Sequence, residues 1–323
     1  MKARRSAARS ALYMAAAGIA LTPFDFALRR LERNAYEQAA KPTEPIILVV
    51  GPPRSGTTLV AQYLINTFDV CYLNNLTSMF PRSPISINKL LGKFLPLRPG
   101  DYDAFYGKSR GLAGANDALY IWDRWLGSRR DRVPTALKPG AGESMKQFFG
   151  ALENLYHLPL VNKVNRLNTC AHLVSNELKN VHFLCLQRDP LLLAQSLFVA
   201  RSYISGDMQS AYGVQHPDAE IDDPIEDVCR QVLFHENQAR RQQELLGTDK
   251  FSVISYEDFC RDPAALAELL TKEHPELRAR NNEGPITRSF EIANKRKLPD
   301  HVFEQMRQRL SELGAGNVSC RGF

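Results

Sequence analysis

The segment from Gly51 to Thr58, G-P-P-R-S-G-T-T, has the residue types of an anion-binding loop. Its glycines and small side chains allow successive backbone N–H groups to point at one spot, and Arg54 supplies a cation within the loop. A phosphate or a sulfate is the natural ligand of such donors. Gly51 and Gly56 have the spacing of a nucleotide-binding loop that continues with lysine, but Thr57 occupies the lysine position. A kinase or ATPase would therefore lack its main charge-neutralising side chain, and an anion with less charge fits better.

A second candidate phosphate site lies downstream. Arg188 directly follows the apolar run 181–187, and Ser196 lies eight positions later in a helical segment. An arginine at the end of a strand and a hydroxyl about two helical turns further on can face one phosphate from adjacent elements. Alternatively, Arg188 pairs with Asp189 and Ser196 only packs or caps. The anion-binding loop upstream favours the phosphate interpretation.

The elements that must position these residues alternate between strand and helix. The run Ile46–Val50 is short, apolar and β-branched, which is typical of a strand buried on both faces of a parallel sheet. Periodicity predicts further strands at 70–73, 158–164, 181–187 and 251–255. It predicts helices at 113–126, 143–158, 169–178, 190–205, 224–246 and 263–270. The predicted fold class is α/β, a parallel sheet flanked by helices, in which ligands gather at the carboxyl ends of the strands.

The motif P-R-S-G-T-T-L after an apolar strand, combined with Arg188 and Ser196, resembles the sulfotransferase family. The resemblance implies a P-loop-like α/β fold and the donor 3′-phosphoadenosine 5′-phosphosulfate (PAPS). It also implies that Arg188 and Ser196 bind the 3′-phosphate. The implied 5′-phosphosulfate loop comprises Pro53, Arg54, Ser55, Gly56, Thr57 and Thr58.

Two further matches to the family are looser. The resemblance implies that Tyr256, in the stretch F-S-V-I-S-Y-E-D, lies beside the adenine at a strand end with its ring available for stacking. It also implies that Lys297 belongs to a basic loop that closes over the 3′-phosphate. A solvated charge run explains Lys295, Arg296 and Lys297 equally well.

For catalysis, the same resemblance points to Arg54 and Lys163. Arg54 is expected to stabilise the leaving phosphate electrostatically, because arginine does not give up its proton at neutral pH. Lys163 aligns with a lysine that precedes a catalytic histidine in small-molecule sulfotransferases, but Asn165 occupies the histidine position here. An acceptor hydroxyl still needs a base. Asp117, expected on the helix 113–126, is our candidate, and the rivals are Glu143 and His157.

Composition sets broader limits. The 323 residues carry a net charge of +6 and are 44% apolar, which suits one folded domain with anionic partners. The cysteine spacing shows no metal-binding pattern, and Cys71 and Cys185, in apolar runs, are expected to be buried thiols. The two tryptophans, Trp122 and Trp125, are expected to pack in the core.

We expect two parts in the chain, an N-terminal helical segment over 1–40 and a catalytic domain over 41–323. The N-terminus is basic up to Arg9 and apolar over 11–21, which is short of the roughly 20 residues of a spanning helix. Two interpretations stay open, a helix on an anionic membrane surface and a helix docked on the domain. The proline-rich region 77–110 is expected to be a long irregular insertion that covers the site.

The leading hypothesis is a sulfotransferase that acts on a hydroxyl of a glycan, glycolipid or other large acceptor. Arginine in the phosphosulfate loop favours that acceptor class, since several glycan and protein sulfotransferases have arginine there. The alternatives are a P-loop kinase and a non-catalytic nucleotide-binding protein at a membrane surface. We expect no metal and no nucleic-acid partner, and a cytoplasmic protein with possible peripheral membrane contact.

Overall fold

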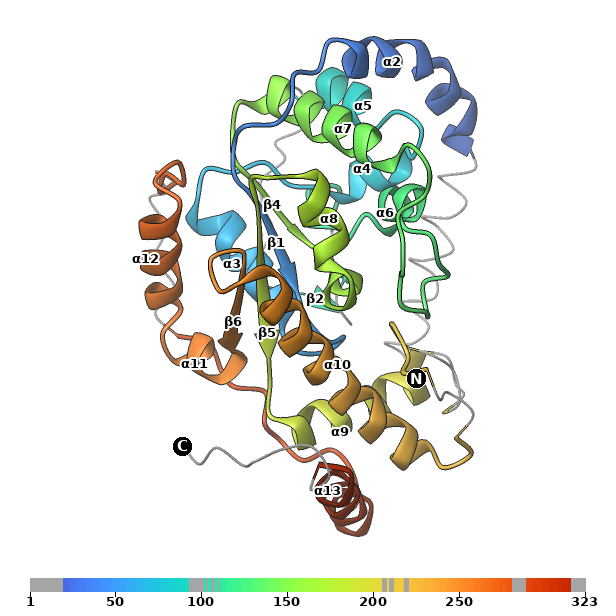
Figure 1. The fold of residues 1–323 in the computed structure, drawn as a ribbon, viewed down its shortest axis with the longest axis vertical. Helices are drawn as coiled ribbons and strands as arrows, with labels where there is room; N and C mark the ends of the chain where they lie inside the picture. The colour runs from blue at the N-terminus through green and yellow to red at the C-terminus, as the bar shows by residue number, and fades with distance from the viewer. Residues whose placement is uncertain are drawn as a thin grey trace.

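The computed structural model describes residues 20–92, 102, 104–105, 108–109, 111–204, 208, 212–217, 221–280 and 289–314. A four-stranded parallel sheet forms its centre (Figure 1). The strands lie in the order β4 (Leu160–Lys163), β1 (Ile46–Val50), β5 (Val181–Gln187) and β6 (Phe251–Ser255). Because the chain reaches β4 on one side of β1 and β5 on the other, the strand order reverses at β1. In open α/β sheets the carboxyl end of such a strand is the expected ligand position.

Helices cover both faces of the sheet, which explains why β1 is buried throughout. Side chains alternate along a strand, so Leu48 and Val50 face one helical layer while Ile47 and Val49 face the other. The first layer contains α6 (Leu119–Trp125), α7 (Ala141–Tyr156), the 3₁₀ helix η1 (Asn165–Thr169), α8 (Ala171–Glu177) and α10 (Pro224–Leu246). The second contains α3 (Thr57–Thr67), α11 (Tyr256–Arg261) and α12 (Pro263–Glu273). The predicted α/β class is confirmed.

Further elements lie at the two ends of the molecule (Figure 1). At the lower end in the figure, α9 (Pro190–Ile204) and α13 (Asp300–Gly314) pack with α10 in a separate apolar cluster. At the upper end, α2 (Arg29–Glu37) lies over α5 (Pro84–Leu91) and α7, with α4 (Asn75–Met79) below. Strands β2 (Ala104–Phe105) and β3 (Lys108–Ser109) form a short antiparallel pair. Sequence periodicity did not predict α13 or this pair.

Several predicted elements are wrong or displaced. Residues 70–73 form no strand, because only Cys71 bridges to Leu160 before Asn74 caps α4. The region 77–110, expected to be irregular, contains most of α4 and the whole of α5. Proline is tolerated at the start of α5 because a helix leaves its first N–H groups unbonded. The helix expected from residue 113 begins only at Leu119, after Ala118 in the left-handed conformation (φ 48°).

Predictions about buried side chains hold. Trp122 and Trp125 are almost fully buried and pack edge to face, with ring centroids 5.2 Å apart. Cys71 and Cys185 are buried thiols, as expected, and the other described cysteines are also buried and free. These residues therefore belong to the packing of the sheet layers.

The described part of the N-terminal segment, residues 20–40, is docked on the domain. Asp25 accepts a hydrogen bond from Ser83 Oγ at 2.6 Å, and Glu32 accepts one from Ser86 Oγ at 2.8 Å. Both carboxylates are buried at the start of α5, where the helix dipole favours negative charge. Residues 1–19 lie outside the described residues. In the described part of the chain, no helix is both long enough and apolar enough to cross a bilayer.

Candidate active site

The loop 51–56 joins β1 to α3 at the carboxyl end of the sheet. Arg54 has a positive φ of 74°, which is uncommon for a residue with a side chain. Gly56 has φ 100°, and a Cβ atom there would lie 2.4 Å from the ring of Tyr256. Glycine is therefore required for the close approach of loop and ring. The N–H groups of Leu59 and Val60 donate to the carbonyl of Gly56. Those of Thr57 and Thr58, the first two residues of α3, have no intrahelical acceptor, so they provide anion donors beside Arg54.

The hydroxyls of the loop and of the start of α3 form hydrogen bonds within the loop and to residues of β4 and η1. Ser55 Oγ is buried and donates to the carbonyl of Pro52 at 2.8 Å. Thr57 Oγ1 donates to Asn165 Oδ1 at 2.9 Å, and Thr58 Oγ1 accepts from Lys163 Nζ at 3.2 Å. Of these predicted cofactor residues, Ser55 donates both its hydroxyl and its backbone N–H to the carbonyl of Pro52, the N–H at 3.2 Å. Pro53, also in the predicted set, is buried in the loop.

Arg188 lies at the carboxyl end of β5, as predicted, and its guanidinium is held by neutral groups. Its Nη1 donates to the carbonyl of Arg54 at 3.1 Å and its Nη2 to the carbonyl of Ala293. Its Cζ lies 4.9 Å from the ring centre of Tyr256. Within the described residues, no carboxylate lies within 4.0 Å of this guanidinium. Burial lowers the pKa of Arg188, but an arginine still keeps its positive charge at neutral pH.

Ser196 on α9 meets a different arginine from the one expected. Arg54 Nε donates to Ser196 Oγ at 3.3 Å, while Arg188 binds the backbone of Arg54. The spacing between Arg188 and Ser196 thus brings two arginines and one hydroxyl together at the ends of β1 and β5. Sequence reasoning had placed Arg54 and Ser196 on separate phosphates.

Tyr256 lies one residue beyond β6, as the first residue of α11, and is only 5% exposed. One partner of its ring is the Arg188 guanidinium, so the ring is less available for stacking than predicted. Its Oη accepts from the backbone N–H of Ala293 at 3.4 Å. The segment that follows Ala293 is held by Gln195, whose Oε1 accepts from the backbone N–H of Lys297 at 2.6 Å. The basic segment therefore runs beside Arg188, with the side chain of Lys297 exposed.

On the other side of β1, Lys163 forms an ion pair. Its Nζ lies 2.5 Å from Asp117 Oδ1, and the side chains are 8% and 27% exposed, respectively. Asp117 belongs to the turn before α6 rather than to the helix predicted for it. The structure thus brings together the two residues that the sequence had suggested for catalysis, and Thr58 links them to the loop.

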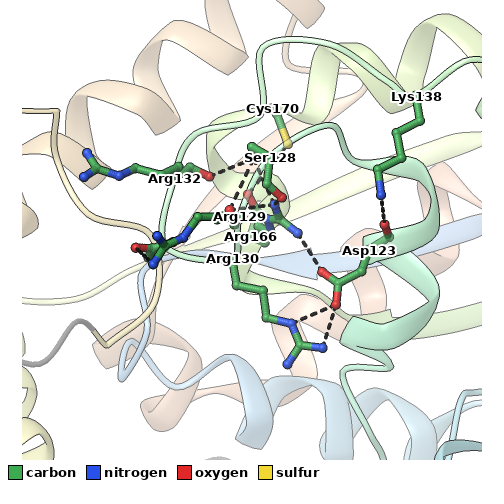
Figure 2. A network of polar contacts seen from close by, with 9 residues as sticks. Asp123, Ser128, Arg129, Arg130, Arg132, Lys138, Arg166 and Cys170 are labelled. Atoms are coloured by element: carbon green, nitrogen blue, oxygen red, sulfur yellow. Dashed lines mark hydrogen bonds and ion pairs between the residues drawn. The ribbon is translucent and has the colours of Figure 1, made fainter.

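A buried arginine that sequence reasoning missed holds this side in place (Figure 2). Arg166 in η1 donates to Asp123 Oδ1 at 2.9 Å and to the carbonyl of Arg129 at 2.8 Å. Figure 2 shows Arg130 reaching the same Asp123 carboxylate. The network fixes η1 to α6, and therefore the position of Asn165 relative to the turn that carries Asp117. No motif spacing signals it, because its members come from three separate segments.

Comparisons with known proteins agree with this architecture. No protein-family model matches the chain, and no curated protein matches its sequence. The crystal structure of sulfotransferase STF9 from Mycobacterium avium matches with a TM-score of 0.53 and 17% identity, covering 92% of this chain and 74% of that one. Sulfotransferase STF1 from Mycobacterium tuberculosis matches with a TM-score of 0.51 and 13% identity, covering 89% and 81%. The chain has the sulfotransferase fold.

The rival bases have no described contact that connects them to the phosphate loop. His157 ends α7 just before β4, so it lies near the amino edge of the parallel sheet, opposite the loop. Glu143 is exposed in the first turn of α7. Of the three candidates, Asp117 is the one that the described contacts connect to the loop.

Proposed function

We propose that this protein is a sulfotransferase that moves a sulfuryl group from PAPS to a hydroxyl of a glycan, a glycolipid or another large acceptor. The juxtaposition of Arg54, Arg188 and Ser196 at the carboxyl ends of β1 and β5 carries the proposal. These groups surround the backbone donors of the phosphate loop. Arginine at position 54, rather than lysine, supports the large-acceptor class.

The residues present fit the phosphates of PAPS. The Nε–H of Arg188 is buried, and no described residue accepts its hydrogen bond. A buried donor without an acceptor costs about 1–3 kcal/mol, which a phosphate oxygen would recover. The cation–π contact with Tyr256 and the carbonyl of Arg54 hold Arg188 in the orientation needed. When bound, PAPS supplies the sulfuryl group and leaves as adenosine 3′,5′-bisphosphate.

The chain's own residues divide the work of transfer. The acceptor oxygen forms a bond to sulfur as the bond between sulfur and the phosphate oxygen breaks. Arg54 and the loop N–H groups stabilise the negative charge that collects on that phosphate. Asp117 takes the proton of the acceptor hydroxyl, and Lys163 holds the Asp117 carboxylate in place at 2.5 Å.

Thermal unfolding with two ligands tests the donor assignment. Adenosine 3′,5′-bisphosphate should raise the melting temperature, because a ligand that binds only the folded state stabilises it by mass action. ATP with Mg²⁺ should raise it less at equal concentration. A larger shift with ATP and Mg²⁺ would favour the kinase alternative. Transfer of label from radiolabelled PAPS to a panel of glycans and glycolipids then tests the acceptor class.

We also propose that the N-terminus contacts anionic membranes peripherally. The support is the basic stretch ending at Arg9, followed by apolar residues. Because Asp25 and Glu32 anchor the following segment, the deletion should stop at residue 19 to keep the docked part. In a flotation assay, the truncated protein should no longer bind anionic vesicles. It should still bind adenosine 3′,5′-bisphosphate. Unchanged vesicle binding would refute the membrane proposal.

A further inference from the structure

Two histidines and a glutamate meet at the amino edge of the sheet, at the opposite ends of the strands from the phosphate loop. His182 is the second residue of β5, Glu273 ends α12, and His274 follows it. His182 Nδ1 lies 3.2 Å from His274 Nε2, and the ligand atoms of all three side chains lie within 4.8 Å of one another. Chain spacing gave no sign of this cluster, because one histidine comes from a strand and the other from the end of a distant helix.

The separation of the two nitrogens suits a metal ion. A tetrahedral Zn²⁺ with bonds of about 2.0–2.1 Å to nitrogen places two ligand nitrogens about 3.3 Å apart. The observed separation of 3.2 Å is close to this value. Glu273 is exposed and sits on the same turn as His274, so rotation of a flexible side chain brings its carboxylate to the third position. Solvent reaches the remaining position from that side.

The hydrogen bonds around His182 are compatible with a metal-binding tautomer. Ser252 Oγ lies 2.8 Å from His182 Nε2 and also 3.4 Å from the carbonyl of Thr248. In the tautomer protonated at Nε2, the serine hydroxyl accepts from Nε2–H and donates to that carbonyl. The lone pair is then on Nδ1, the atom that faces His274. Bound metals in proteins commonly have such a second partner on the far nitrogen of each histidine.

The charges around the cluster also suit a cation. Besides Glu273, the carboxylates of Glu276 and Asp249 act on His274 and His182, respectively, and their negative charge favours a bound cation. Two imidazoles and a carboxylate form a donor set that suits a divalent cation.

We propose that His182 Nδ1, His274 Nε2 and the Glu273 carboxylate form a binding site for a divalent transition metal of the Zn²⁺ class. Such an ion would join the end of α12 to the start of β5. The site is independent of sulfuryl transfer, because it lies at the opposite edge of the sheet from Arg54.

Zinc titration of the full chain, stripped with chelator and desalted, tests the site. Calorimetry should show one Zn²⁺ per chain, and Co²⁺ should give the visible absorption of a four-coordinate complex. His274→Ala should weaken Zn²⁺ binding by at least tenfold, and Glu273→Gln should weaken it less. His301→Ala, an exposed histidine on α13, is the matched control and should bind as the unmodified protein does.

Two results would overturn the proposal. One is a chain that takes up no Zn²⁺ or Co²⁺, which would leave a plain hydrogen bond between the two rings. The other is His274→Ala with unchanged affinity and unchanged Co²⁺ spectrum. Melting curves without metal check that the variants are folded, and neither substituted side chain is fully buried. Zn²⁺ should raise the melting temperature of the unmodified chain but not that of His274→Ala.

Discussion

The two sides of β1 differ in how their charged side chains are paired. On the β5 side, neutral carbonyls and an aromatic ring hold Arg188, and no described carboxylate forms an ion pair with it. On the β4 side, Lys163 is paired with Asp117 at 2.5 Å, so the pair is neutral overall. An anion is attracted to the first side, whereas the second offers a carboxylate to a neutral hydroxyl. Under the proposed function, the donor belongs to the β5 side and the acceptor to the β4 side.

Asp117→Asn removes the proposed base on the β4 side and should cause the largest loss of turnover. The amide keeps the shape of the side chain but accepts no proton, so turnover should fall by about 10²- to 10⁴-fold. Affinity for adenosine 3′,5′-bisphosphate should stay the same, because the proposed donor site lies on the other side. Glu304→Gln removes an exposed carboxylate from an ion pair on α13 and serves as the control. Steady-state transfer from PAPS with calorimetry of the bisphosphate measures both quantities, and full turnover in Asp117→Asn would exclude it as the base.

Arg54→Ala tests the proposed stabilisation of the leaving phosphate. Loss of one preorganised charge donor typically lowers the rate by about 10²- to 10³-fold, and donor affinity should fall much less. Arg54→Lys should restore part of the rate, although the contact with Ser196 would be lost. Single-turnover transfer measures the rate, with Arg307→Ala on α13 as the control. A loss confined to affinity would make Arg54 a binding residue only.

Arg188→Ala should weaken binding of the donor's 3′-phosphate on the β5 side. A hydrogen bond to a charged group contributes about 1.5–3 kcal/mol, so affinity for adenosine 3′,5′-bisphosphate should fall roughly 10- to 100-fold. The loss should disappear for adenosine 5′-monophosphate, which lacks the 3′-phosphate. Calorimetry with both ligands makes the comparison. Equal losses for the two ligands would show that Arg188 does not bind the 3′-phosphate.

Acidification should destabilise the fold through a buried histidine of α10 that contacts η1. His235 is buried on α10, where it contacts Asn168 of η1 and donates to the carbonyl of Val214. Burial lowers its pKa from 6.5 to about 4. The unfolded chain therefore takes up the proton first, and the free energy of unfolding falls between pH 6.5 and about 4, by on the order of 3 kcal/mol. Below that range this contribution is constant.

Urea unfolding at several pH values measures this effect. His235→Gln should have a shallower dependence on pH than the unmodified chain between pH 6.5 and about 4. His301→Ala, which removes an exposed histidine, should retain the original slope. Identical slopes for all three proteins would show that His235 does not govern the acid sensitivity.

The sequence alone determined the local units of the site. The strand, loop and helix around 46–59 are contiguous, and their glycines, apolar run and helical spacing act over a few residues. The same holds for Arg188 at the end of β5. Local patterns were wrong where a side chain redirected the backbone. Asn74 caps α4 and ends the expected strand at 70–73, and the left-handed Ala118 delays α6.

Only the tertiary structure decided which of these units meet. The ion pair of Lys163 with Asp117, the contact of Arg54 with Ser196 and the His182–His274 pair each join segments far apart in the chain. Such contacts depend on the strand order and on which helix covers which face, and no periodicity encodes those choices. The charge difference between the two sides of β1 arises from these long-range contacts. The sequence determined which charged residues were available, and the sheet order determined which of them are neutralised.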